Sequence, residues 1–165
     1  MDSYEINKDT LAILPKNDKE SIVYEKDNQY IVNESVDKIM EESCLYFGSN
    51  LEGRKAGSAR LLNLTHKLPI LVEESNSIIF FPTSSPRLST CSWISLNNID
   101  HYERYNKGSK LVFKDGQTLD LSMSYGMLDN QVLRSSRLQY LIQARNEEKI
   151  VKKWKKTKKM GHFMV

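Results

Sequence analysis

The chain has 165 residues, of which 39% are hydrophobic and 27% charged, so its length and composition are those of one globular domain. Its apolar runs are too short for a transmembrane helix, and its acidic, polar start does not have the pattern of a signal peptide. We therefore expect a cytoplasmic protein that makes no use of a membrane.

The net charge of +3 conceals a strong polarity along the chain. Residues 1–42 carry eleven Asp or Glu against five Lys, whereas residues 145–165 carry eight Lys or Arg against two Glu. Such asymmetry favours an anionic partner for the second half, although charge on a solvated helix face is an ordinary alternative.

The first part of the chain predicts an antiparallel β unit. Short alternating segments are typical of half-buried strands, and the Asp27-Asn28 pair suits the turn of a hairpin between the third and fourth of them. The predicted strands are residues 3–7, 10–15, 20–26 and 28–34.

A helix is predicted next, over residues 35–47. Ser35 is a suitable N-cap, Gly48 is suited to end the helix, and apolar residues recur at three- and four-residue steps between them.

Residues 48–62, GSNLEGRKAGSARLL, surround the basic pair Arg54 and Lys55 with glycine and other small residues. Two interpretations are equally open: a basic surface turn, or a Gly53–Gly57 loop whose small residues let an arginine enter a narrow groove. Another short helix is expected to start near Gly57 and to end before Pro69.

Strand patterns return after Pro69 and predict a second antiparallel unit. Residues 69–82 read as a hairpin, residues 90–96 as a strand, and Asp115-Gly116 gives the strongest hairpin signal of the chain within residues 109–124. Residues 82–90, PTSSPRLST, are predicted to form an exposed loop with Arg87 as its one charge.

The last part changes to a helical period. A helix is predicted over residues 127–145, with a lysine-rich tail at residues 146–165. Three interpretations of this tail stay open: a solvated basic end, a specific contact, or a helix at a membrane surface. The fold class is therefore α+β, with antiparallel β units, a helix near 35–47, a C-terminal helix, and one domain over residues 1–145.

Catalytic chemistry has no support in the sequence. His66, His101 and His162 lie far apart, and no nucleophile elbow, phosphate-binding loop or metal-ligand motif is present. Cys44 and Cys91 are expected to be buried free thiols. We expect no enzyme, no catalytic residue, no metal and no cofactor.

Several separated blocks resemble one known family, and they keep its order along residues 3–138. The blocks are FGS…GRKAG, THK-P-I-V…SN-I-FFPT, C-WIS and NQV-R. In these blocks the chain is similar to the ComK family of competence transcription factors.

The resemblance implies a transcriptional activator of genes for DNA uptake. Family members bind paired AT-rich boxes of double-stranded DNA mainly through the minor groove, act as dimers arranged in pairs, assist RNA polymerase, and are delivered to a Clp protease by an adaptor. A nucleoid-associated location follows. We infer DNA contacts for Gly53, Arg54, Lys55, Gly57, Arg60, Lys67, Arg134 and Arg137.

The chain departs from the family at its end. The family continues past the NQV-R helix into a longer segment with aromatic and proline-containing parts, whereas this chain closes with KKWKKTKKMGHFMV. An alternative function is therefore a non-enzymatic regulatory paralogue, which pairs with another activator or adaptor without productive DNA binding.

Overall fold

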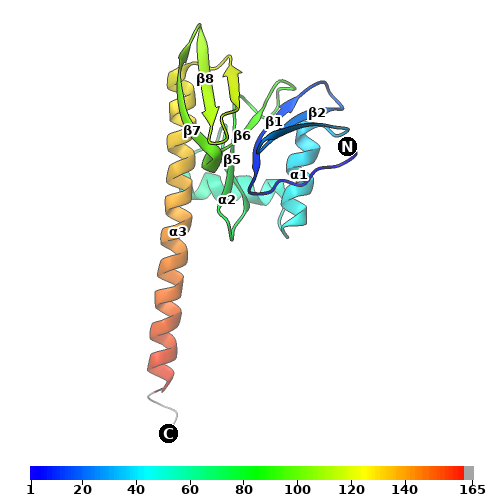
Figure 1. Ribbon diagram of the computed structural model, residues 1–165. Helices are drawn as coiled ribbons and strands as arrows, with labels where there is room; N and C mark the ends of the chain where they lie inside the picture. Colours follow the sequence, from blue (N-terminus) through cyan, green and yellow to red (C-terminus); the bar gives the residue numbers. More distant parts are fainter. Residues whose placement is uncertain (162–165) are drawn as a thin grey trace.

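Two antiparallel sheets and three α-helices make up the computed structural model, which describes the backbone of residues 1–161 and the side chains of residues 1–158 (Figure 1). The helices are α1 (Val36–Tyr46), α2 (Leu51–Leu62) and α3 (Tyr125–Gly161). The strands are β1 (Thr10–Pro15), β2 (Ser21–Glu25), β3 (Asn28–Val32), β4 (Ile70–Glu73), β5 (Ile78–Pro82), β6 (Trp93–Ser95), β7 (Ile99–Tyr105), β8 (Gly108–Phe113) and β9 (Thr118–Leu121). The predicted α+β class is confirmed.

The larger sheet has six strands in the order β3-β2-β1-β6-β5-β4. Its two halves join where β1 pairs with β6, with Ala12 opposite Ile94 and Ile13 opposite Trp93. The predicted second antiparallel unit is divided between the two sheets, because β4 to β6 extend the first unit through this long-range pairing and β8 and β9 belong to the smaller sheet. The smaller sheet is β7-β8-β9, and its first strand was not predicted because most of its side chains are exposed and polar.

Both faces of the larger sheet are buried, and neighbouring residues of its strands point to opposite faces. Phe80 and Trp93 pack with α1 in one core, whereas Phe81 and Ile94 pack in a second core against the smaller sheet and the start of α3. A third cluster joins α2, β4, β5 and α3. Since both faces are covered, the central strands are apolar at nearly every position.

The N-terminal segment is not a strand, so the prediction for residues 3–7 is wrong. Tyr4 and Ile6 are buried, but the Ile6 amide donates to Ser43 Oγ at 3.0 Å and the Tyr4 hydroxyl lies 2.7 Å from Thr10 Oγ1. The apolar alternation here reflects packing beside α1 rather than pairing in a sheet.

Residues 51–62 form a helix, and both interpretations of the Gly53–Gly57 segment as a turn or a loop are wrong. Asn50 caps α2, because its Oδ1 accepts a hydrogen bond of 2.6 Å from the Gly53 amide. Ser58 and Leu62 are the buried residues of this helix. The cap and this burial offset the low helix propensity of two glycines.

The predicted helix over residues 35–47 is confirmed by α1, together with both of its predicted end signals. Ser35 Oγ accepts from the Lys38 amide at 3.2 Å, and Gly48 lies just beyond the helix with a φ of 82°. The Asp115-Gly116 turn is likewise confirmed between β8 and β9, with a φ of 93° at the glycine.

The helical position of Gly57 makes a substitution testable. A Cβ built at Gly57 meets no atom within 4 Å, so Gly57→Ala is expected to raise the free energy of unfolding by about 0.5–1 kcal/mol through helix propensity. Urea unfolding measures the change. Gly116→Ala is the contrasting variant, since its φ of 93° strains alanine and is expected to lower stability. Destabilisation by both variants would contradict the helical assignment of Gly57.

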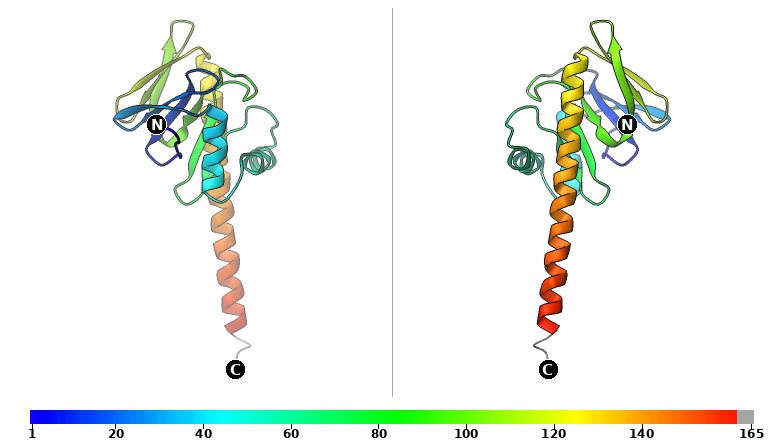
Figure 2. Two further views of the ribbon diagram at one scale, coloured as in Figure 1. Left: turned by 90° about the vertical axis from the view of Figure 1, so that its right-hand side faces the viewer. Right: turned by 90° about the vertical axis from the view of Figure 1, so that its left-hand side faces the viewer.

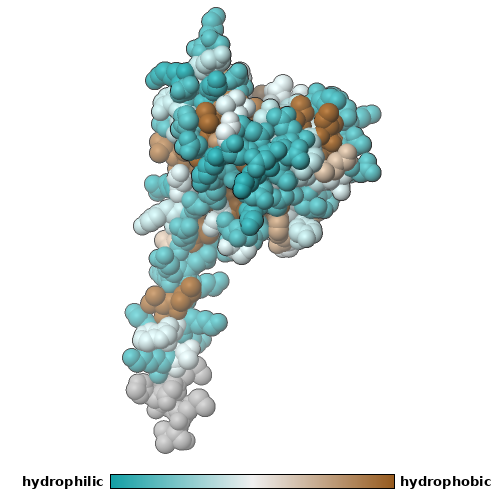
Figure 3. All heavy atoms as spheres, viewed as in Figure 1, coloured by the Kyte–Doolittle hydropathy of each residue, from teal (hydrophilic) through white to brown (hydrophobic). Residues whose placement is uncertain are grey.

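Helix α3 begins near the predicted residue 127 but continues to Gly161, well past the predicted end at 145 (Figures 1 and 2). Its first half packs on the body through Leu128, Leu138 and Ile142, whereas Ile150 and Trp154 are 68% and 60% exposed. Figure 3 shows hydrophobic side chains among hydrophilic ones on the projecting part. Residues 162–165 of the predicted tail, with His162, lie outside the described residues.

Two local contacts support the projecting part of α3. A Glu148–Lys152 ion pair of 3.7 Å spans one turn, and Lys158 Nζ lies 4.9 Å from the centre of the Trp154 ring. Within residues 1–161, none of the helices carries an apolar stretch of the length that a bilayer crossing needs.

Candidate nucleic-acid interface

A hollow of about 460 Å³ lies between the start of α2, the turn that follows α2, and the loop after β5; we call it the basic groove. Four of its side chains are cationic or can become so, and none of its lining residues is acidic. The lining residues are Lys55, Thr65, His66, Lys67, Leu68, Ser85, Pro86 and Arg87. A site with several cations and no carboxylate favours a polyanion.

Helix α3 holds the two loops of the basic groove in place. The amide of Gln131, which is 4% exposed, donates to the carbonyl of Lys67 at 3.0 Å and to the carbonyl of Pro82 at 2.8 Å. Arg134 Nη1 donates to the carbonyl of His66 at 3.1 Å. Because one buried amide fixes both loops, the cations of the groove are carried by a positioned backbone.

A second hollow of about 120 Å³ continues the basic groove toward α3. It shares Lys67, adds Arg134, and offers the polar side chains of Thr83 and Asn130. The two hollows together form a strip of cations and hydrogen-bonding groups, which is the combination that phosphate contacts require.

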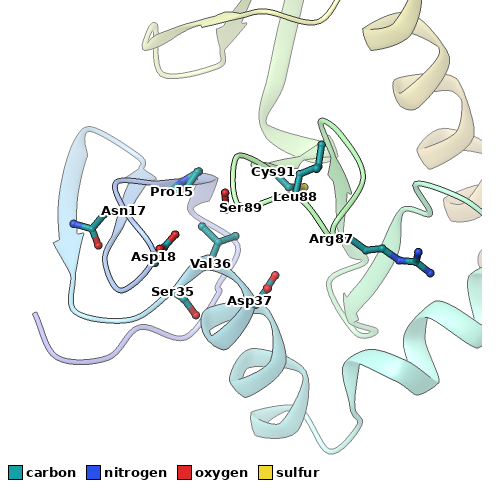
Figure 4. A pocket seen from close by; sticks show the side chains of 10 residues that line it. All are labelled: Pro15, Asn17, Asp18, Ser35, Val36, Asp37, Arg87, Leu88, Ser89 and Cys91. Carbon is teal, nitrogen blue, oxygen red and sulfur yellow. The ribbon is translucent and has the colours of Figure 1, made fainter.

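Arg87 belongs to this strip although it also lines another hollow. That hollow, of about 250 Å³, contains Asp18 and Asp37, and Figure 4 shows the Arg87 side chain directed away from both and toward α2. The predicted exposure is confirmed for residues 87–90 of the loop, whereas residues 83–86 are half-buried, and Arg87 stands between Pro86 and the exposed Leu88. The loop therefore presents a guanidinium at its exposed end, beside the apolar side chain of Leu88.

Arg54 and Lys55, predicted as one basic pair, face different places. Lys55 lines the basic groove and lies 3.8 Å from Glu52, whereas Arg54 lines a hollow of about 180 Å³ between α2 and α3. The Arg54 Nε is buried and has no hydrogen-bond partner among the described residues. Gly53 and Gly57 line the same hollow as Arg54, together with Arg145.

Of the other residues predicted to contact DNA, two lie at the strip and two lie outside it. Lys67 and Arg134 lie together at the strip, while Arg60 and Arg137 are exposed and line neither of its two hollows. Sequence reasoning missed His66 and Arg87 as members. The signal for Arg87 was its position as the one charge in an exposed loop, but the proximity of that loop to α2 is a tertiary fact.

The cysteines are free and buried, as predicted. Burial raises the pKa of the Cys44 thiol to about 11 and also raises the pKa of the Cys91 thiol. Both thiols are therefore protonated at neutral pH, which disfavours thiolate chemistry. Within residues 1–161, no group of three acidic, histidine or cysteine side chains is arranged to hold a metal ion.

The fold and the groove define a class: an α+β protein of two antiparallel sheets with a cationic strip that has no acidic lining residue and suits a polyanion. The chain belongs to the ComK protein family, whose profile matches residues 1–147. It is 35% identical over 157 residues to the competence transcription factor of Bacillus subtilis (strain 168), across 93% of this chain and 82% of that protein. No solved structure matches the chain.

Proposed function

We propose that this protein is a DNA-binding transcriptional activator of competence genes, which recognises AT-rich promoter boxes mainly through the minor groove. The observation that carries the proposal is the basic strip, in which Lys55, Lys67, Arg87 and Arg134 meet without a carboxylate in its lining. Membership of the ComK family and the relative named competence transcription factor support the same function.

The strip divides the work of recognition between two kinds of contact. Lys55, Lys67 and Arg134 neutralise phosphates and fix the position of the protein on the duplex, a role that carries no sequence information. Arg87 enters the minor groove, because an AT-rich minor groove is narrow and strongly negative and attracts a guanidinium that extends from an exposed loop. AT preference therefore resides mainly in Arg87.

Paired AT boxes call for more than one protomer, so the active form is a dimer or a pair of dimers, which contacts RNA polymerase at the promoter. Control through a Clp-protease adaptor belongs to the same proposal. Family membership supports the proposed partners, and the basic strip supports the proposed DNA contact.

The proposal predicts a defined salt dependence. In gel shifts with AT-box and GC-rich duplexes of equal length, the AT-box duplex is expected to bind about tenfold more tightly. Four phosphate or groove contacts per protomer, at about 0.9 each, give a slope of about −3.6 for log K against log salt.

Equal affinity for both duplexes would contradict AT recognition, and absence of any shift at physiological salt would favour the regulatory paralogue. Co-purification with a second activator or an adaptor would then identify its partner.

A further inference from the structure

The hollow of about 180 Å³ between α2 and α3 contains two cations and no acid; we call it the interhelical hollow. Helix α2 lies crosswise to α3 (Figure 1), and Arg54 of α2 and Arg145 of α3 both line the hollow. None of its lining residues is acidic, and none of them belongs to the basic strip. The interhelical hollow is therefore a separate cationic site.

Arg54 is the residue that points to a missing ligand. Its Nε is buried without a hydrogen-bond partner, and its guanidinium forms no ion pair within the part of the chain whose side chains are described. The neighbouring Lys55, by contrast, lies 3.8 Å from Glu52. A buried donor that carries a charge is costly unless an acceptor pairs with it.

Arg145 makes the same demand from the other side of the hollow. It forms no ion pair with any residue from 1 to 158. Two guanidinium groups that share one hollow favour an anion, and their planar forks match the two oxygens of a carboxylate. The charge of the hollow therefore selects an anionic ligand.

The rest of the lining selects a ligand that also has an apolar part. Leu71, Leu138 and Ile142 line the hollow and are 5%, 1% and 3% exposed. An inorganic ion would leave this apolar surface uncovered, whereas an aliphatic chain attached to the anionic group would cover it. Cations above a buried apolar lining are suited to an amphiphilic anion.

The size of the hollow limits the length of the chain. A water molecule takes up about 30 Å³ in the liquid, so this volume holds about six groups of that size. A carboxylate with an aliphatic chain of about five carbons fits. Gly57 leaves room beside the ligand, because a Cβ built there meets no atom within 4 Å.

We propose that the interhelical hollow binds a small amphiphilic carboxylate. Arg54 and Arg145 pair with the carboxylate group, and the aliphatic chain packs on Leu71, Leu138 and Ile142. The proposal does not rest on DNA binding, because the interhelical hollow shares no lining residue with the basic strip.

Titration of the full chain with hexanoate, followed by NMR of its backbone amides in the absence of DNA, tests the proposal. Hexanoate is expected to bind about tenfold or more tightly than acetate, which has the charge without the chain, and than hexanol, which has the chain without the charge. Hexylamine, with the opposite charge on the same chain, is expected not to bind.

A pair of double variants separates the hollow from net charge. Arg54→Gln with Arg145→Gln is expected to weaken hexanoate binding about tenfold or more, since both charge-assisted contacts are lost. Arg60→Gln with Arg137→Gln removes the same charge from exposed positions of the same two helices outside the hollow. This control is expected to bind hexanoate within about threefold of the wild type.

Two substitutions of Gly57 test the space without changing the charge. Gly57→Leu is expected to fill the hollow and to weaken hexanoate binding about tenfold or more, whereas Gly57→Ala is expected to leave it within about threefold of the wild type. Leucine and alanine both have higher helix propensity than glycine, so both variants are expected to fold. Circular dichroism checks this.

Absence of hexanoate binding to the wild type, equally tight binding of acetate or hexanol, equal losses in the two arginine pairs, or full binding by Gly57→Leu would each overturn the proposal. Displacement of hexanoate by an equal concentration of inorganic phosphate would show a site for simple anions and would overturn it as well. Because the titration contains no DNA, a failure of this site is distinguishable from a failure of the proposed function, which the gel shifts report separately.

Discussion

Replacing Lys67 and Arg87 together by alanine is expected to weaken binding to an AT-box duplex about 100-fold at physiological salt. Each side chain loses one contact to DNA, and a loss of about 1.4 kcal/mol per contact is a factor of ten in affinity. Fluorescence anisotropy with a labelled duplex measures the change. The slope of log K against log salt is expected to become less steep by about 1.8, which corresponds to the loss of two contacts.

The matched control removes two cations from outside the strip. Arg60→Ala with Arg137→Ala lowers the net charge equally but changes exposed residues that line neither hollow, so affinity is expected to fall less than about threefold. Equal losses in the two double variants would show that general charge, and not the basic strip, binds DNA.

A separate experiment addresses the single substitution Arg87→Ala. If Arg87 enters the minor groove, this variant is expected to lose more affinity for the AT-box duplex than for the GC-rich duplex, whereas Lys67→Ala lowers both alike. Parallel losses would contradict the division of work between the two residues.

Gln131→Met is expected to lower the free energy of unfolding by about 2 kcal/mol and AT-box affinity about tenfold. Methionine fills a similar volume but cannot donate, so the carbonyls of Lys67 and Pro82 both lose their hydrogen bonds. The two loops of the basic groove then lose their common support on α3. Urea unfolding and anisotropy on the same preparation measure both effects.

Gln139→Met is the control on the same helix. Gln139 Nε2 donates to Asn97 Oδ1 at 3.1 Å, away from the basic groove, and the residue is half-buried. This variant is expected to leave AT-box affinity unchanged. A Gln131→Met variant with lower stability but wild-type affinity would show that the loops hold their positions without the glutamine.

Features that depend on neighbouring residues were predictable from the sequence. The Ser35 cap and the Asp115-Gly116 turn each use residues within one turn of chain, so their signals are complete in a short window. The strands at 10–15 and 69–82 follow from runs of apolar residues bounded by turn residues. The same reliance on local signals explains the wrong prediction of a strand over residues 3–7. Tyr4 and Ile6 are buried against α1 and not in a sheet, and an alternation of apolar and polar residues is the same in both cases.

The region from residue 48 to residue 62 shows the limit of local reasoning. Two glycines lower helix propensity and favour a loop by composition, but Asn50 caps the segment and Ser58 and Leu62 are buried against the body. Packing outweighed helix propensity in this segment. Arg54, which the composition predicted in a loop, is therefore half-buried on a helix.

The sequence by itself determined the α+β class, most of the strands, the helix after Ser35, the charge polarity and the likeness to the ComK family. The tertiary structure alone decided that β1 pairs with β6, that α2 is helical, and that Lys55, Lys67, Arg87 and Arg134 meet at one strip. These residues lie up to half the chain apart. Local patterns specify elements, whereas the pairing of distant strands and the burial of helix faces bring their side chains together.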